Sequence, residues 1–159
     1  MTPTPALVAW LALIGYAEGA SYNTIVSGVD GPHTFTDFSQ HPFASGRAPI
    51  EVVAPGARFP HGLYSTASGR YQFTLPTWKF INAQVGLPDF GPASQDAGCL
   101  HYLGIHGVPS MIVAGNIQEA ILTCGQSWGW ASFAGSTAGQ GGKTLGDMLE
   151  KYRELTAQV

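Results

Sequence analysis

A run of apolar residues near the N-terminus ends at a single acid. From Pro5 to Ala17 every residue is apolar or glycine apart from the hydroxyl of Tyr16, and Glu18 is the only acid among the first 29 residues. Thr4 is suited to the N-cap of a helix, and Gly19 is suited to its end. Because the run is apolar on nearly every face, it predicts a helix buried in the core, with Glu18 at its C-terminal end.

The surroundings expected for Glu18 disfavour its ionised form. An apolar environment raises the pKa of a carboxyl group, and the negative end of a helix dipole acts in the same direction. A carboxylic acid that stays protonated near neutral pH is what glycosidic bond cleavage requires of its general acid. Glu18 is therefore the candidate catalytic acid. The simpler interpretation is an exposed glutamate that only ends a helix.

The composition is typical of a compact core with long, irregular loops. The chain has 159 residues, of which 21 are glycine and 11 are proline, while charged residues make up only 11%. This length predicts a single domain, 1–159, with a core of its own. The net charge of −3 and the scattered basic residues argue against a nucleic-acid partner, because such proteins usually carry a basic patch.

The apolar run also bears on where the protein is made. A signal peptide has a basic segment before its apolar core, whereas residues 1–4 contain no Lys or Arg. The run is also too short to span a bilayer. We therefore expect synthesis in the cytoplasm without a signal peptide, and no stable membrane association. The chain has only two cysteines, Cys99 and Cys124, which is consistent with synthesis in a reducing compartment. We expect two buried free thiols. The two predicted helices that carry them could nevertheless bring the thiols close together.

Turn residues and apolar periodicity predict a mostly helical α+β chain. Two short β-like runs, 24–26 and 34–36, flank a turn cluster and predict a small irregular hairpin. Caps and apolar spacing predict further helices at 74–86, 92–106, 109–113, from 116 toward 128, and from 144 onward. The segments 43–66 and 133–142 are rich in glycine, the first also in proline, and are expected to be long loops. Loops of such length within one domain are usually functional or mobile.

A polysaccharide-cleaving enzyme also needs side chains that hold sugars. Tyr71 and Gln72 could form hydrogen bonds to a saccharide, and Trp128 or Trp130 could offer a stacking face. Asp37 is the only plausible second carboxylate. The simpler interpretation of the tryptophans is ordinary core packing. For Asp37 it is the capping of a turn, which is a common role of Asp beside Ser and Thr.

A histidine-rich stretch offers a different hypothesis. His33, Asp37 and His41 recur at a four-residue spacing, with His61 further on, and could hold a metal in a zinc-dependent peptidase or amidase. Turn residues occur throughout this stretch, so no helix would place the three side chains on one face, and no recognised zinc spacing is present. We therefore expect no metal site and no cofactor.

The chain resembles the lambda-type phage lysozymes, endolysins that act on peptidoglycan as lytic transglycosylases. Short motifs carry the resemblance, each weak alone but specific as an ordered set that runs almost end to end. They are Tyr16-Ala17-Glu18-Gly19, Phe35-Thr36-Asp37-Phe38-Ser39 with His41-Pro42, Ser68-Gly69-Arg70-Tyr71-Gln72, Gly86-Leu87-Pro88-Asp89-Phe90, Ser94-Gln95-Asp96-Ala97, Leu122-Thr123-Cys124 and Trp130-Ala131-Ser132. The pair Trp128-Gly129 departs from the pattern, as an insertion before the last motif.

The resemblance implies a lysozyme-like fold with Glu18 as general acid. It also implies that two loops, Ser45 to Gly62 and Phe133 to Gly142, form lips over a saccharide cleft. The family's substrate is peptidoglycan, and the resemblance implies that this chain cleaves it to lyse the host cell. It also implies a monomer that acts in the periplasm after its release from the cytoplasm. The substrate-binding residues that we expect are Tyr71, Gln72, Asp37, Trp130 and Ser132.

The presence of one clear acid predicts the reaction. Glu18 would protonate the glycosidic oxygen and then take the proton from the C6 hydroxyl of muramic acid, which attacks C1 of the same sugar. The product would be a 1,6-anhydromuramic end. A hydrolytic lysozyme would need a second carboxylate, for which Asp37 stays open. A peptidoglycan-binding module without activity is a third possibility, against which the intact Glu18 motif argues.

Overall fold

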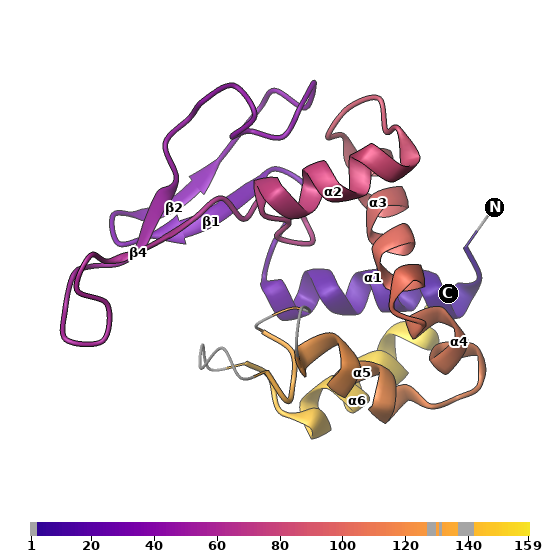
Figure 1. The fold of residues 1–159 in the computed structure, drawn as a ribbon. Helices are drawn as coiled ribbons and strands as arrows, with labels where there is room; N and C mark the ends of the chain where they lie inside the picture. Colours follow the sequence, from indigo (N-terminus) through magenta and orange to yellow (C-terminus); the bar gives the residue numbers. More distant parts are fainter. Residues whose placement is uncertain (1–2, 127–129, 131, 137–141) are drawn as a thin grey trace. The chain divides into compact units, whose positions relative to one another are not determined.

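The computed structural model describes residues 3–126, 130, 132–136 and 142–159. Its contacts divide the chain into two compact units, one formed by 1–19 with 99–159 and the other by 20–98. The elements follow in the order α1 (Pro5–Glu18), β1 (Thr24–Gly28), β2 (Gly31–Thr34), β3 (Ile50–Val53), β4 (Leu63–Ser65), α2 (Leu75–Val85), α3 (Pro92–Ile105), α4 (Val108–Val113), α5 (Ile117–Gln126) and α6 (Leu145–Thr156) (Figure 1). The predicted α+β class is confirmed.

Helix α1 begins and ends where the sequence predicts. The Thr4 side chain accepts a hydrogen bond from the backbone N–H of Leu7, and Pro5 occupies the first turn. Gly19 adopts the left-handed conformation that ends the helix, with φ of 59°. Such a residue lets the chain leave a helix without a Cβ clash, which is why glycine is favoured there.

The core of the first unit surrounds Trp10 on α1. Its ring is fully buried and packs on Phe133, with ring centroids 6.3 Å apart, and on Tyr152 of α6 at 5.4 Å. Helix α6 contacts both α1 and α5, and α4 also contacts α1 (Figure 1). This explains why a helix that is apolar on nearly every face is stable here.

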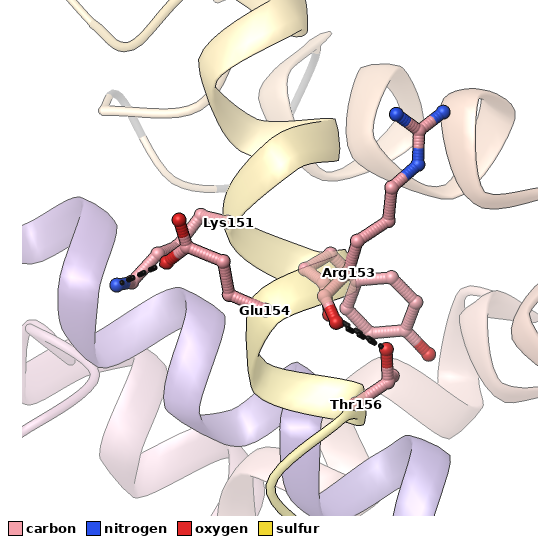
Figure 2. A network of polar contacts seen from close by, with 5 residues as sticks. Lys151, Arg153, Glu154 and Thr156 are labelled. Atoms are coloured by element: carbon pink, nitrogen blue, oxygen red, sulfur yellow. Dashed lines mark hydrogen bonds and ion pairs between the residues drawn. The ribbon is translucent and has the colours of Figure 1, made fainter.

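The last helix is held by local polar contacts. Thr144 and Asp147 form a reciprocal capping box at the start of α6. At its far end Lys151 forms an ion pair with Glu154 at 2.8 Å, and the Thr156 hydroxyl donates to the Arg153 carbonyl (Figure 2). The capping box fixes where α6 begins, just after the segment that carries the second predicted loop.

The second unit contains two small antiparallel hairpins. The predicted hairpin near the N-terminus is confirmed, because β1 pairs with β2 and Thr24 lies opposite Thr34. Its second strand, however, ends at Thr34 and does not extend over 34–36 as predicted. Phe35 instead enters the core, where it packs on Phe38 and Phe90 with ring centroids 4.9 and 5.8 Å away.

The second hairpin, β3 with β4, was not predicted, and the expectation of no regular structure over 43–66 is wrong. Ile50 pairs with Ser65 and Glu51 with Tyr64, after which the register shifts. A strand of three residues is too short to show an alternating pattern, and the prolines and glycines between the strands obscure the rest. The Val29 N–H also donates to the Glu51 carbonyl at 2.9 Å, which ties the two hairpins together.

The helices of the second unit follow the predicted caps. Thr74 caps α2, and Gly86 ends it in the left-handed conformation. The N-terminal half of α3 packs closely on α2. The closeness is seen at Gly98, where an added Cβ would lie 2.8 Å from the ring of Trp78. Glycine at that position allows the two helices to approach. The close packing holds the first turns of α3 in place, where Gln95 and Asp96 lie.

Candidate active site

Glu18 is the last residue of α1 and lies at the edge of the apolar core. Its neighbours Gly15 and Ala17 are buried, and the last turn of the helix contains no basic residue. No cation on the helix therefore offsets the negative end of the helix dipole beside this carboxyl group. Neither of the ion pairs found in the described part of the chain includes Glu18.

Among the described residues, the polar partner of the Glu18 carboxyl group is the side chain of Ser132. The Ser132 hydroxyl donates a hydrogen bond to Oε1 of Glu18. Burial raises the pKa of Glu18 from 4.5 to about 7, and the hydrogen bond from Ser132 acts in the opposite direction. A pKa near 7 leaves a substantial fraction protonated at neutral pH, which is the state a general acid requires.

The turn that carries Ser132 is held by backbone contacts. The N–H of Phe133 donates to the Trp130 carbonyl at 3.0 Å, and the N–H of Lys143 donates to the Ser132 carbonyl at 2.9 Å. Gly142 lies so close that an added Cβ would be 2.7 Å from the Ser132 carbonyl oxygen. Ser132 thus meets Glu18 from a fixed turn. The sequence singled out Ser132 only as a saccharide contact, and no local pattern pairs it with Glu18.

Tyr71 and Gln72 lie in a tight turn of the second unit. The turn is closed by Ser68 and Phe73, whose backbones exchange hydrogen bonds of 3.0 and 2.9 Å. Tyr71 is only 1% exposed, and its hydroxyl donates to Asp96 at 2.6 Å. Gln72 is the one non-glycine residue with positive φ, 48°, in the part of the chain that the structure describes. Residues in such sparsely populated conformations cluster at functional sites.

Trp130 lies in the core of the first unit. It is 6% exposed, and its ring lies 5.8 Å from Phe133 and 6.1 Å from Tyr102, measured between centroids. Its ring is thus used for packing, and stacking of a sugar on it stays a prediction. Trp128 and residues 137–141 of the second predicted loop lie outside the described residues.

Asp37 is exposed and caps a turn. Its carboxylate accepts a hydrogen bond from the Ser39 N–H at 2.8 Å, and hydrogen bonding to Ser39 lowers the pKa of Asp37. The side chain is therefore ionised at neutral pH. It belongs to the second unit and Glu18 to the first. A role for Asp37 in binding or in water activation stays a prediction.

The histidines of the predicted metal set have other partners. His33 lies 2.8 Å from Asp30, and neither contacts Asp37. His41 is 1% exposed, its Nδ1 accepts from the Phe43 N–H, and its Nε2 donates to the Phe73 carbonyl at 2.9 Å. Burial lowers the pKa of His41, so the ring is neutral and both nitrogens are used. The described residues contain no cluster of three potential metal ligands.

The two cysteines are buried and are not joined by a disulfide in this structure. Burial raises the pKa of Cys124 to about 12, so its thiol stays protonated and unreactive at neutral pH. Cys124 therefore does not provide a nucleophile. Among the described residues, no helix combines the length and the apolar character needed to cross a bilayer.

Comparison with known proteins gives the family. The sequence profile of the family described as Endolysin matches residues 8–159. The chain belongs to the endolysin family. It is 37% identical to the endolysin of Escherichia phage P2 over 157 residues, covering 92% of this chain and 90% of that one. It is 32% identical to the endolysin of Escherichia phage lambda over 161 residues, covering 95% and 91%.

Solved structures of the family share the fold. The lysozyme of bacteriophage lambda in complex with a chitohexasaccharide superposes with a TM-score of 0.79 at 31% identity, covering 98% of this chain and 96% of the other. A second structure of lysozyme from bacteriophage lambda gives 0.70 at 29% identity, covering 99% and 94%. The predicted resemblance and the predicted lysozyme-like fold are both confirmed. This endolysin is a lysozyme-like enzyme that degrades peptidoglycan.

Proposed function

We propose that the chain is a lytic transglycosylase that cleaves the β-1,4 bond between N-acetylmuramic acid and N-acetylglucosamine, leaving a 1,6-anhydromuramic end. The observation that supports this most is the environment of Glu18. Burial keeps its pKa near 7, and among the described residues its polar contact is a neutral hydroxyl. One group with a pKa close to neutrality can give a proton and take one back in the same reaction.

The proposed reaction uses Glu18 twice. As an acid, it protonates the glycosidic oxygen while the bond to C1 of muramic acid breaks. As a carboxylate, it then accepts the proton of the C6 hydroxyl of the same sugar as that oxygen attacks C1. The reaction consumes no water, because the proton that Glu18 gives to the leaving oxygen is replaced by the proton of the C6 hydroxyl. Glu18 therefore ends the reaction protonated, as it began. In the second state, the Ser132 hydroxyl would stabilise the carboxylate by its hydrogen bond.

No carboxylate of the described residues in its own unit accompanies Glu18, which supports this route over hydrolysis. A retaining hydrolase places its two carboxyl groups about 5 Å apart, and two acids so close raise one another's pKa. Within the described part of the unit that holds Glu18, no carboxylate contributes to its raised pKa, which burial causes. A hydrolytic lysozyme that uses Asp37 of the other unit is the alternative.

The proposed substrate-binding residues come mostly from the turn 69–72. Gln72, held with positive φ, is the first candidate for hydrogen bonds to the saccharide, and Tyr71 shapes the turn from within. A relative, lambda lysozyme, has been seen with a chitohexasaccharide, which supports a β-1,4-linked glycan strand as the ligand here. Asp37, Trp130 and Ser132 remain further candidates.

The product of the reaction tests the proposal. Purified peptidoglycan is digested in ¹⁸O-labelled water, and the released muropeptides are analysed by mass spectrometry. Transfer to the C6 hydroxyl predicts ends lighter by one water, without label and without new reducing groups. Reducing muramic ends that carry ¹⁸O would overturn the proposal and make Asp37 the next residue to mutate.

A further inference from the structure

The turn 69–72 holds one non-glycine residue, Gln72, in a backbone conformation that such residues rarely adopt. Gly69 has φ of 77° and Gln72 has φ of 48°. A non-glycine residue in this region is strained and persists only where the surrounding structure imposes the conformation. The amide side chain of Gln72 donates to the Gly69 carbonyl at 2.9 Å, which closes the turn internally. The remaining support comes from outside the turn, from α3.

Gln95 of α3 joins the turn to two other segments of the chain by hydrogen bonds. Its side chain is fully buried, and its Oε1 accepts from the Arg70 N–H at 2.9 Å. Its Nε2 donates to the carbonyls of Tyr22 and Phe90 at 2.9 and 2.8 Å. An added Cβ at Gly69 would lie 2.2 Å from Oε1 of Gln95, so the turn rests directly on this amide.

Asp96, the next residue of α3, holds two tyrosines at once. The hydroxyl of Tyr22 donates to Oδ1 of Asp96 at 2.9 Å, and the hydroxyl of Tyr71 donates to the same oxygen at 2.6 Å. The two rings meet edge to face at 87°, with centroids 6.5 Å apart. Burial, followed by the hydrogen bond to Asp96, raises the pKa of Tyr22, so its hydroxyl remains a donor.

Arg70 completes the arrangement without neutralising Asp96. Its guanidinium group lies 5.2 Å from the centre of the Tyr22 ring, and no ion pair between Arg70 and Asp96 is found in the described structure. Among the described residues, the Asp96 carboxylate accepts hydrogen bonds from the hydroxyls of Tyr22 and Tyr71. Hydrogen bonds to an ionised acceptor are stronger than those between neutral groups. Removal of the acceptor would leave these hydroxyls without a hydrogen bond, which destabilises the arrangement that they hold.

We propose that Asp96 is a positioning residue of this enzyme, which fixes the turn 69–72 in its saccharide-binding conformation by accepting the hydroxyls of Tyr22 and Tyr71. The inference rests on the proposed function only in assigning the turn to saccharide binding. Asp96 does not touch substrate in this account. It acts through Tyr71, whose neighbour Gln72 would present its amide to the sugar.

The test compares Asp96→Ala with Asp96→Asn on soluble glycan strands from peptidoglycan, measuring kcat and KM separately. Loss of the acceptor should raise KM about tenfold, the size of effect expected for buried hydrogen bonds left unmade. The turnover number should change little, and the pH profile, which Glu18 sets, should not move. Asparagine keeps an acceptor oxygen in the same place, so Asp96→Asn should recover most of the affinity.

A matched control comes from the same helix start. Asp89 accepts hydrogen bonds from the Ser94 hydroxyl and the Gly91 N–H at 2.6 and 2.8 Å, without contacting the turn 69–72. Asp89→Ala should lower stability and leave KM unchanged. If Asp89→Ala raised KM as much as Asp96→Ala does, the rise in KM would reflect lost stability and not the position of the turn, and the proposal would fail.

Further outcomes decide the proposal even if Asp96→Ala does not fold. Tyr22→Phe keeps the ring and removes one of the two hydroxyls, so KM should rise about two- to threefold, as expected for one weakened network contact. An unchanged KM in folded Asp96→Ala or in Tyr22→Phe would overturn the positioning role. The identity of the product, anhydro or reducing, does not enter this test, so the two proposals fail independently.

Discussion

The hydroxyl of Ser132 donates a hydrogen bond to the carboxyl group of Glu18 across 114 residues of sequence. Two opposing influences meet at this contact. Burial raises the pKa of Glu18 to about 7, and the hydrogen bond lowers it. The balance between them decides how much of the acid is protonated at the pH where the enzyme works.

Removal of the hydroxyl should therefore shift the pH dependence of activity. In Ser132→Ala, the pKa of Glu18 should rise above about 7, because burial remains and the stabilising hydrogen bond is lost. The alkaline limb of kcat/KM, where the acid loses its proton, should move to higher pH. Ser110→Ala, on the exposed side of α4, serves as control. A limb that stays in place or moves to lower pH would contradict the assigned role of Ser132.

The space around Ser132 gives a second prediction. A Cβ at Gly142 would lie 2.7 Å from the Ser132 carbonyl oxygen, so Gly142→Ala must displace the turn that carries Ser132. We expect activity to fall, by up to about 100-fold, as displacements of about 1 Å near a catalytic group can cause.

The matched control lies four residues later, in α6. At Gly146 the nearest atom to an added Cβ is the Thr144 hydroxyl oxygen at 3.9 Å, so alanine fits. Gly146→Ala should retain full activity and gain up to about 1 kcal/mol of stability from its helix propensity. Equal activity in the two variants would show that the position of Ser132 is not important.

Replacement of the acid itself should abolish lysis. Glu18→Gln keeps the shape of the side chain and removes both proton transfers. General acid–base catalysis contributes about 10²–10⁴-fold, and one group here carries both steps. We expect turbidity assays on purified cell walls to show a loss in that range or larger. Lysis within tenfold of the unmodified enzyme would exclude Glu18 as the catalytic acid.

The same variant should change the stability of the protein with pH. A carboxyl group whose folded pKa is about 7 and whose ordinary value is 4.5 stabilises the folded state fully below pH 4.5, and that stability is lost as the pH rises through 7. The loss is roughly 3 kcal/mol. In denaturant titrations, Glu18→Gln should match the unmodified protein near pH 4 and be more stable at pH 8. Equal stability at both values would mean that Glu18 is not buried.

Local sequence signals predicted the helices well. Thr4, Thr74 and Thr144 each cap a helix where the sequence places one, and Gly19 and Gly86 end two of them. Caps act within one turn of helix, so neighbouring residues contain the information. The hairpin of β3 and β4 was missed because its pairing joins short strands across a long connection, where no period is visible.

The candidate site was only partly predictable for the same reason. The uncharged helix before Glu18 indicated its burial and its raised pKa. The partner of its carboxyl group, however, comes from a turn that packs beside α1 only in the folded chain. The network of Asp96 with Tyr22 and Tyr71 is also formed by residues far apart in sequence. Side-chain pairs of this kind depend on tertiary packing, which a local pattern does not encode.

A direct titration of Glu18 tests whether burial raises the pKa of this catalytic acid. The protein is labelled with ¹³C at the glutamate side-chain carboxyls, and the resonance of Glu18 is assigned by its absence in Glu18→Gln. Its chemical shift is then followed from pH 4 to pH 9. We predict a midpoint near the value of about 7 that burial gives this carboxyl group. A midpoint near 4.5, the ordinary value for glutamate, would contradict it.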